Sequence, residues 1–108
     1  MSAGAVGPTA APPPPLVLGV EGEMTIYRAP DLKKAFLDAL ASGAPIRIDL
    51  SRVTEIDTTG VQLLVLVRHL ADGRNRDLAL VAPSDVVRGV LQSLDLERRL
   101  GLSPNAPR

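Results

Sequence analysis

The stretch RVTEIDTTGVQLLVLVRHL, from Arg52 to Leu70, places an acid, two threonines and a glycine between a β-branched segment and a dense apolar run. The apolar residues that follow Thr58 recur at helical spacing. An aspartate or threonine is a preferred helix N-cap, because its side-chain oxygen accepts an unpaired backbone N–H. The stretch therefore predicts a strand exit, a cap at Asp57 or Thr58, and a helix from about Thr58 to Gly73.

The segments on both sides of this stretch alternate between strand-like and helix-like patterns. In chain order we first expect a strand from Leu16 that ends in a turn at Glu21 to Glu23, and a short strand at Thr25 to Tyr27. A helix opened by Pro30 and Asp31 and stopped by Gly43 follows, and then a strand at Ile46 to Leu50. After the helix from Thr58 we expect a strand at Asp77 to Ala82, a helix opened by Pro83 and Ser84, and a short helix at Leu96 to Leu100 that Asp95 caps. Because helices alternate with strands in the second half, right-handed parallel crossovers around a central sheet are favoured. The order predicts a small α/β domain.

The chain is sized for one domain with flexible ends. It has 108 residues, and 45% of them are apolar, which is enough for a core. The Ala- and Pro-rich segment 1–15 is expected to be a disordered tail, residues 16–102 to form the domain, and residues 103–108 to fray. The first segment lacks the features of a signal peptide, and no apolar run nears the roughly 20 residues that cross a bilayer. We therefore expect a cytoplasmic protein without direct membrane insertion.

Charge and composition argue against several function classes. Twelve basic residues balance twelve acidic ones, so nothing favours nucleic acid as a partner. There is no cysteine, and the lone histidine, His69, falls on the polar arc of its helix. No metal-ligand spacing and no phosphate-binding glycine loop occurs. We expect no cofactor, no metal site and no enzymatic activity.

A receiver domain phosphorylated on Asp57 is one alternative, because an acid at a strand end suits it. Such a domain also needs an acidic pair near the first strand for Mg²⁺ and a lysine near a late strand. Glu21 and Glu23 could imitate the pair, but the only lysines are Lys33 and Lys34, on the first helix. The pattern therefore disfavours a receiver domain.

The hydroxyls at the start of the central helix could carry a switch. A phosphate on Thr58 would meet unpaired N–H groups and would add about −1.5 to −2 charges beside Asp57. Gly60 fits a close backbone approach in the first turn. On a helical wheel, Val61 and Val65 fall on the polar arc. Either the last helices cover these valines, or they form a small docking patch beside Thr58.

The residues IDLSRVTEIDTTGVQLLVLV resemble the core signature of the STAS domain, the family of sulfate-transporter and anti-sigma-factor-antagonist domains. The likeness continues through GEMTIYRAPDLKKAFLDAL before the signature and LALVAPSDVVRGVLQSLDL after it, and so covers residues 16–102. It implies a four- to five-stranded mixed sheet with about four helices packed mainly on one side. It also implies a binding module that acts by docking rather than by catalysis.

The resemblance assigns roles to individual residues. Stand-alone members of the family often antagonise anti-sigma factors, and the hydroxyl residue after the signature acid is phosphorylated by a partner serine/threonine kinase that is itself the anti-sigma factor. Carried to this chain, this makes Thr58 the phosphorylation site and Thr59 the second choice. The expected docking surface consists of Glu21, Glu23, Met24, Asp57, Thr58, Thr59, Gly60, Val61, Gln62 and Val65.

The form DTTGVQLL supports a second reading of the resemblance. Position 58 is threonine where the commonest antagonists have serine, and the form is closer to a branch found beside lipid-transport ATPases and in chemotaxis gene clusters. The alternative is therefore a non-phosphorylated regulatory subunit of a lipid-transport ABC system or of a chemotaxis-associated complex, with a transporter subunit as its partner. A purely structural interaction domain is a third class.

Overall fold

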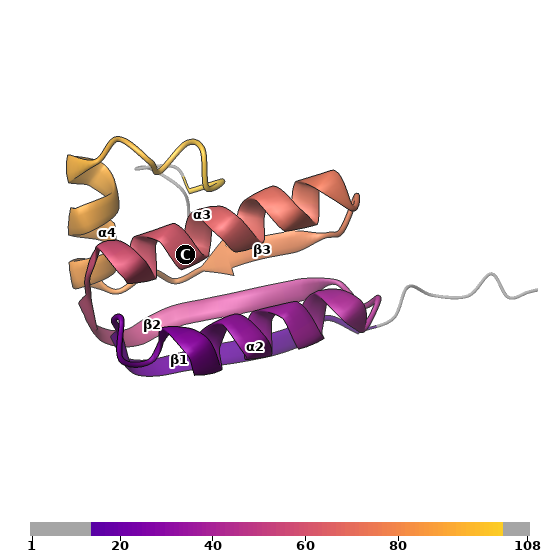
Figure 1. The fold of residues 1–108 in the computed structure, drawn as a ribbon. Helices are drawn as coiled ribbons and strands as arrows, with labels where there is room; N and C mark the ends of the chain where they lie inside the picture. Colours follow the sequence, from indigo (N-terminus) through magenta and orange to yellow (C-terminus); the bar gives the residue numbers. More distant parts are fainter. Residues whose placement is uncertain (1–13, 103–108) are drawn as a thin grey trace, which may run out of the picture.

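Three parallel strands and three helices form the part of the chain that the structure describes. The computed structural model describes residues 14–102. Its elements, shown in Figure 1, are β1 (Leu16–Met24), α2 (Ala29–Ala41), β2 (Ile46–Ile56), α3 (Thr58–Gly73), β3 (Leu78–Val81) and α4 (Asp85–Ser93). The strand order is β1-β2-β3, and each neighbouring pair is parallel. The prediction of a small α/β domain is confirmed.

The described sheet is smaller than the four- to five-stranded mixed sheet that we expected. The predicted turn at Glu21 to Glu23 is wrong, because β1 continues to Met24. Gly22 has a φ of 83°, and it shifts the β1–β2 register without reversing the chain. The predicted strand at Thr25 to Tyr27 is also wrong, since the Arg28 N–H donates to the Thr25 carbonyl at 2.9 Å and closes a turn there.

The segment after α4 is a hydrogen-bonded turn where we expected a fourth helix at Leu96 to Leu100. The Leu100 N–H donates to the Leu96 carbonyl at 3.0 Å, which makes one helical turn. Gly101 follows with a φ of 81°, and this left-handed conformation ends the turn. Asp95 has a φ of 58° and therefore belongs to the connection out of α4, not to the cap of a helix.

Local signals set the ends of the three helices. In α2, Pro30 stands in the first turn, and Gly43, with a φ of 84°, follows the last turn. Ser84 caps α4 by accepting the Val87 N–H at 3.4 Å. The observed span of α3 is the predicted one.

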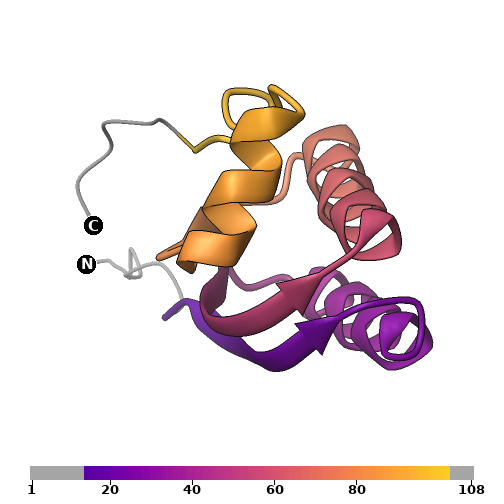
Figure 2. The same cartoon turned by 90° about the vertical axis from the view of Figure 1, so that its left-hand side faces the viewer.

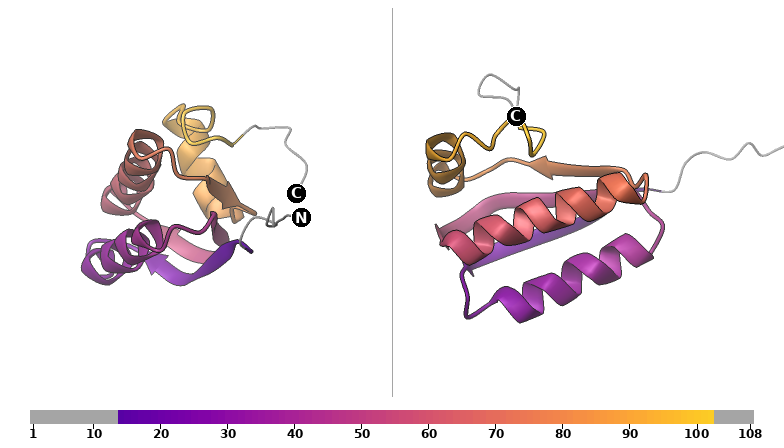
Figure 3. Two further views of the ribbon diagram at one scale, coloured as in Figure 1. Left: turned by 90° about the vertical axis from the view of Figure 1, so that its right-hand side faces the viewer. Right: turned by 45° about the horizontal axis from the view of Figure 1, so that its top comes forward.

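Helices α2 and α3 lie side by side on one face of the sheet (Figure 2, Figure 3), while α4 packs against β2. The inward face of β2 carries Ile46, Ile48 and Leu50, which are at most 2% exposed. Burying each side chain of this kind stabilises the fold by about 1.5–3 kcal/mol. Leu100 and Leu102 join the same core, so the C-terminal turn closes it.

The expected tails lie almost wholly outside the described residues. The disordered tail expected over 1–15 and the frayed end expected over 103–108 extend beyond residues 14–102. Within residues 14–102, no helix combines the length and the apolar character that crossing a membrane requires.

Candidate partner-binding site

Asp57 connects the start of α3 to the turn between β1 and α2. It is the N-cap of α3, and its Oδ1 accepts the Gly60 N–H at 3.0 Å. Its Oδ2 accepts the Ile26 N–H at 3.1 Å, across a separation of 31 residues. The Asp57 N–H in turn donates to the Met24 carbonyl at 3.2 Å. Asp57, and not Thr58, is therefore the cap. Its side chain holds both the start of α3 and the turn between β1 and α2.

The same hydrogen bonds favour the charged form of Asp57. The backbone N–H of Gly60 contributes most, and the N–H of Ile26 adds to it, so the pKa of the Asp57 carboxyl lies below its usual value. The carboxylate consequently stays charged at neutral pH. Any anion attached to the adjacent Thr58 meets a fixed negative charge.

Gly60 allows α3 to approach the end of β1 closely, as its position in the first turn predicted. A Cβ at this position would lie 2.9 Å from both the Ile56 Cγ1 and the Met24 Cβ, and it would overlap the Met24 carbonyl oxygen. Only glycine fits without moving backbone atoms. The start of α3 is thus held against the sheet by packing as well as by the Asp57 hydrogen bonds.

Thr58 stands at the first position of α3 with its side chain exposed. Thr59 is half-buried, and it lines a shallow hollow between α3 and α2. Gln62, one turn along the helix, is exposed. Thr58 is therefore accessible to solvent at the start of α3.

Three residues of the expected docking set are buried. Met24 is 0% exposed, Val61 is 5% exposed, and Gly60 is buried against β1. Val65 is half-buried. These residues shape the surface from below, and in this conformation Met24, Gly60 and Val61 offer a partner no direct contact.

The covering of Val61 answers the question that the helical wheel left open. Val61 and Val65 line one hollow together with Leu96 and Arg99 of the C-terminal turn. Val61 belongs to the buried core, and Leu96, in a turn and not in a helix, packs against that core. Val65 remains at the edge of that contact.

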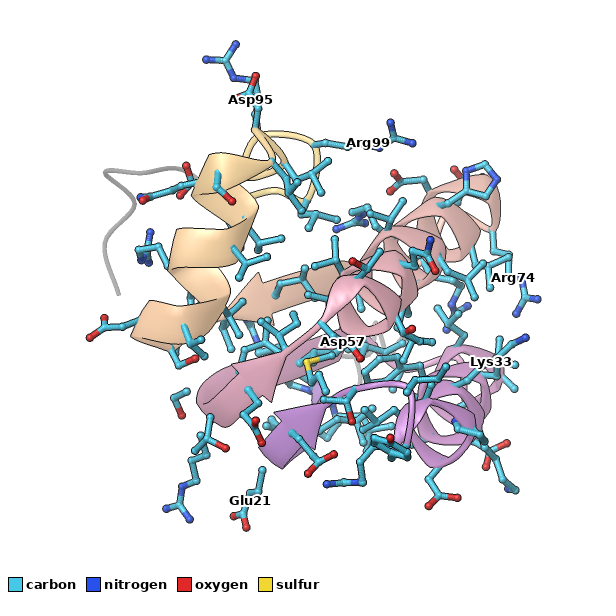
Figure 4. The ribbon with its side chains drawn as sticks, turned by 60° about the vertical axis from the view of Figure 1, so that its left-hand side comes forward. Glu21, Lys33, Asp57, Arg74, Asp95 and Arg99 are labelled. Carbon is cyan, nitrogen blue, oxygen red and sulfur yellow. The ribbon has the colours of Figure 1, made fainter. Side chains whose placement is uncertain are left out.

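The two glutamates of β1 have different surroundings. Glu21 is exposed and pairs with Arg52 of β2, its Oε2 lying 3.1 Å from the Arg52 Nη1. In Figure 4, Glu21 extends away from Asp57. Glu23 is half-buried and accepts the Thr25 hydroxyl at 2.6 Å, so it supports the turn beside Asp57.

The turn that Asp57 holds carries two exposed apolar side chains that the sequence interpretation missed. Ile26 is 61% exposed and Tyr27 is 87% exposed. Their β-branched and aromatic character favoured a strand. Only two residues, Arg28 and Ala29, separate this pair from Pro30, however, and that spacing was the available signal for a turn.

No metal site accompanies these features. Among residues 14–102, no three His, Cys, Asp or Glu side chains gather in a way that could hold a metal ion. The arrangement presents a hydroxyl, an amide and apolar side chains on a fixed backbone, which suits protein recognition.

Comparison with known proteins places this geometry in a family. Residues 9–103 match the family described as "Mlab, STAS domain". No curated protein sequence matches the chain significantly. A sulfate transporter family protein from Wolinella succinogenes has 25% identity and a TM-score of 0.68, covering 85% of this chain and 76% of that one.

Two further similar solved structures are described as an antagonist and as a proposed antagonist. A proposed anti-sigma factor antagonist from Thermotoga maritima has 29% identity and a TM-score of 0.69, over 78% of this chain and 74% of that one. The unphosphorylated anti-sigma factor antagonist SpoIIAA has 24% identity and a TM-score of 0.63, over 76% and 73%, and shows likeness of fold. Since the family match spans nearly the whole described domain, the chain belongs to the STAS domain family of regulatory binding modules.

Proposed function

We propose that this chain is an anti-sigma-factor-antagonist-like module that docks a partner protein beside the start of α3 and is switched by phosphorylation of Thr58. The observation that carries the proposal is an exposed hydroxyl at the first position of α3, next to a carboxylate whose two oxygens are both engaged by backbone N–H groups. The partner is a serine/threonine kinase that also acts as an anti-sigma factor.

Electrostatics supplies the switch. A phosphate on Thr58 adds about −1.5 to −2 charges next to the charged Asp57. The fold tolerates this group, because Thr58 is exposed and caps nothing. A partner seated on the same surface meets the new charge directly and loses affinity.

A second candidate function has its own support. The family description names Mlab, and one similar structure belongs to the sulfate transporter family. In this alternative the same surface binds a transporter subunit of a lipid-transport ABC system, or a chemotaxis-associated complex, and Thr58 stays unmodified.

Mass spectrometry of the intact protein separates the two functions. Incubation with ATP and the kinase encoded near this gene adds the mass of one phosphoryl group under the first function. Thr58→Ala removes that gain, whereas Thr59→Ala keeps it. If the wild-type protein gains no mass with its own kinase, the switch is refuted and the transporter alternative takes its place.

Binding measurements test the effect of the charge. Thr58→Glu is expected to weaken partner binding by about tenfold, since a charge facing a docked protein costs on the order of 1 kcal/mol. Thr54→Glu adds the same charge at an exposed threonine of β2 and serves as the control. Equal affinity of wild type and Thr58→Glu for the partner contradicts the proposed surface.

A further inference from the structure

The turn between β1 and α2 exposes two neighbouring apolar side chains. Tyr27 is 87% exposed and Ile26 is 61% exposed, and no other large apolar side chain among residues 14–102 is more exposed than either. Single apolar residues are common on protein surfaces, so one of them alone would need no explanation. Two adjacent ones on a short turn form a compact apolar projection, which does need one.

Polar bonds, and not these apolar side chains, hold the turn in place. The Arg28 N–H donates to the Thr25 carbonyl at 2.9 Å, and the Ile26 N–H donates to the Asp57 Oδ2 at 3.1 Å. Neither bond uses the side chain of Ile26 or of Tyr27, so both would persist with alanine at these positions. The fold therefore gains little from the two apolar groups, while its hydrogen bonds keep them in a fixed place.

The turn lies at the same end of the molecule as the start of α3 (Figure 1). The Asp57 carboxylate bonds to both segments, since it accepts the Gly60 N–H as well as the Ile26 N–H. Thr58 follows Asp57 in the chain and is exposed. The apolar projection and the proposed phosphorylation site thus share one end of the domain and one carboxylate that holds both.

A preformed apolar projection suits insertion into a pocket of another protein. Tyrosine is enriched among the residues that dominate binding energy, because its ring buries a large area and loses few rotatable bonds. The ordered backbone of the turn lowers the entropic cost of binding further. A kinase that modifies Thr58 must also seat on the residues around Thr58, and the projection is among them.

We infer that Ile26 and Tyr27 are the apolar anchors of the docking surface, and that they enter an apolar pocket of the partner protein. The inference rests on the proposed docking function and adds the residues that make the contact. It also gives the switch a second physical cause. An apolar contact that closes around the turn removes water from the adjacent Thr58, and a phosphate there would lose its hydration.

The composition of the chain provides a direct probe of this contact. Tyr27 is the only tyrosine and Phe36 is the only phenylalanine. Full-length protein made with fluorotyrosine therefore gives one fluorine NMR signal, from Tyr27. Protein made with fluorophenylalanine gives one signal from Phe36, which is buried in the core. Titration with the unlabelled kinase encoded near this gene is expected to shift or broaden the Tyr27 signal and to leave the Phe36 signal in place.

Alanine substitutions measure what each anchor contributes to binding of the same kinase. Tyr27→Ala is expected to weaken binding by about 30-fold and Ile26→Ala by about tenfold, the range of residues that dominate an interface. Val17→Ala is the matched control, because Val17 is 59% exposed, like Ile26, but lies near the other end of β1. Thermal unfolding checks that all three variants keep the stability of the wild type. Equal losses of affinity in Ile26→Ala and Val17→Ala overturn the assignment.

The outcomes also separate the inference from the proposed function. If calorimetry shows that the kinase binds and the Tyr27 signal does not change, the inference is overturned and the docking function stands. If the Tyr27 signal responds and Thr58→Glu leaves the affinity unchanged, the anchors stand and the switch fails.

Two further results decide the remaining cases. If the kinase does not bind, the proposed function fails, and the ATPase of the lipid-transport ABC system becomes the second probe. An unchanged Tyr27 signal with that protein overturns the inference as well. A Tyr27 signal that shifts with the concentration of this chain alone assigns the projection to a contact between copies, which also overturns the inference.

Discussion

The two ends of α3 are built in different ways, although each carries a glycine. At the first end, Gly60 is pressed against β1, and Asp57 bonds to two separate segments. At the last end, a Cβ on Gly73 would find nothing within 4 Å. There the helix stops through ordinary backbone bonds from the Arg74 N–H to the Leu70 and Ala71 carbonyls. Tight packing is thus found at the end of α3 that carries Thr58.

This contrast indicates where the molecule requires a fixed shape. A surface that is already ordered loses little conformational entropy when a partner binds. The first end of α3 is such a surface, because packing at Gly60 fixes the helix and Asp57 fixes the adjacent turn. Near the last end, the Arg68 Nη1 donates to the Leu78 carbonyl at 2.8 Å and ties the helix to β3, but Gly73 has no close packing against the sheet.

Replacing each glycine by alanine is the strongest test of the comparison. Gly60→Ala is expected to lower the free energy of unfolding by about 4 kcal/mol, because the added methyl group meets a backbone oxygen that cannot move aside. Gly73→Ala is expected to be neutral or to stabilise by up to about 1 kcal/mol. Urea denaturation measures both. Similar losses in the two variants would contradict the difference between the ends.

Two leucines of α3 extend the comparison to its two faces. Leu64 is 0% exposed, so Leu64→Ala is expected to cost about 3 kcal/mol of unfolding free energy through the cavity that it leaves. Leu66 is half-buried, and Leu66→Ala is expected to cost less than about 1 kcal/mol. Binding of the partner should give the reverse order, with Leu66→Ala losing more affinity than Leu64→Ala. A large stability loss in Leu66→Ala would assign that residue to the core.

The sequence predicted what depends on near neighbours along the chain. The span of α3 follows from a cap at Asp57 and an apolar period that runs to Gly73, and both signals are local. The Ser84 cap of α4 and the glycine stop of α2 are local in the same sense. Exposure of Thr58 also follows, since the first residue of a capped helix usually faces water.

Features that depend on distant partners were not predictable in this way. The turn expected at Glu21 to Glu23 fails because pairing with β2 carries β1 past Gly22 as a register shift. Val61 is buried in a core against which Leu96, 35 positions later in the chain, packs. The hydrogen bond from the Ile26 N–H to Asp57 joins residues 31 positions apart, so no local sequence pattern could predict it.

The pH dependence of stability tests the role of Asp57. Its pKa is lowered in the folded state, so its contribution is fully present above the ordinary aspartate pKa of about 4 and is lost as the pH falls through the lower folded value. The free energy of unfolding of Asp57→Asn should therefore fall less steeply than that of the wild type as the pH drops from about 5 to about 2. This is the range in which aspartate with a lowered pKa titrates.

Hydrogen exchange distinguishes this role from a general loss of charge. Asp49 also has a lowered pKa, because it accepts the Ser51 N–H at 2.9 Å, and it lies in the middle of β2. Asp57→Asn is expected to speed exchange of the Ile26 amide, whereas Asp49→Asn leaves it unchanged. Equal exchange in both variants would mean that Asp57 does not hold the turn.

The smallest expected effect belongs to Thr58 itself. Because Asp57 is the cap and Thr58 is exposed, Thr58→Ala should change the free energy of unfolding by no more than about 0.5 kcal/mol, the difference in helix propensity. Ser84→Ala, which removes the cap of α4, should cost about 1 kcal/mol in the same urea titration. The absence of a stability role is what frees position 58 for a switch, since a residue that the fold needs could not gain and lose a phosphate without unfolding the helix start. If Thr58→Ala costs as much as Ser84→Ala, the hydroxyl belongs to the architecture of α3, and the contrast between its two ends no longer points to a docking surface.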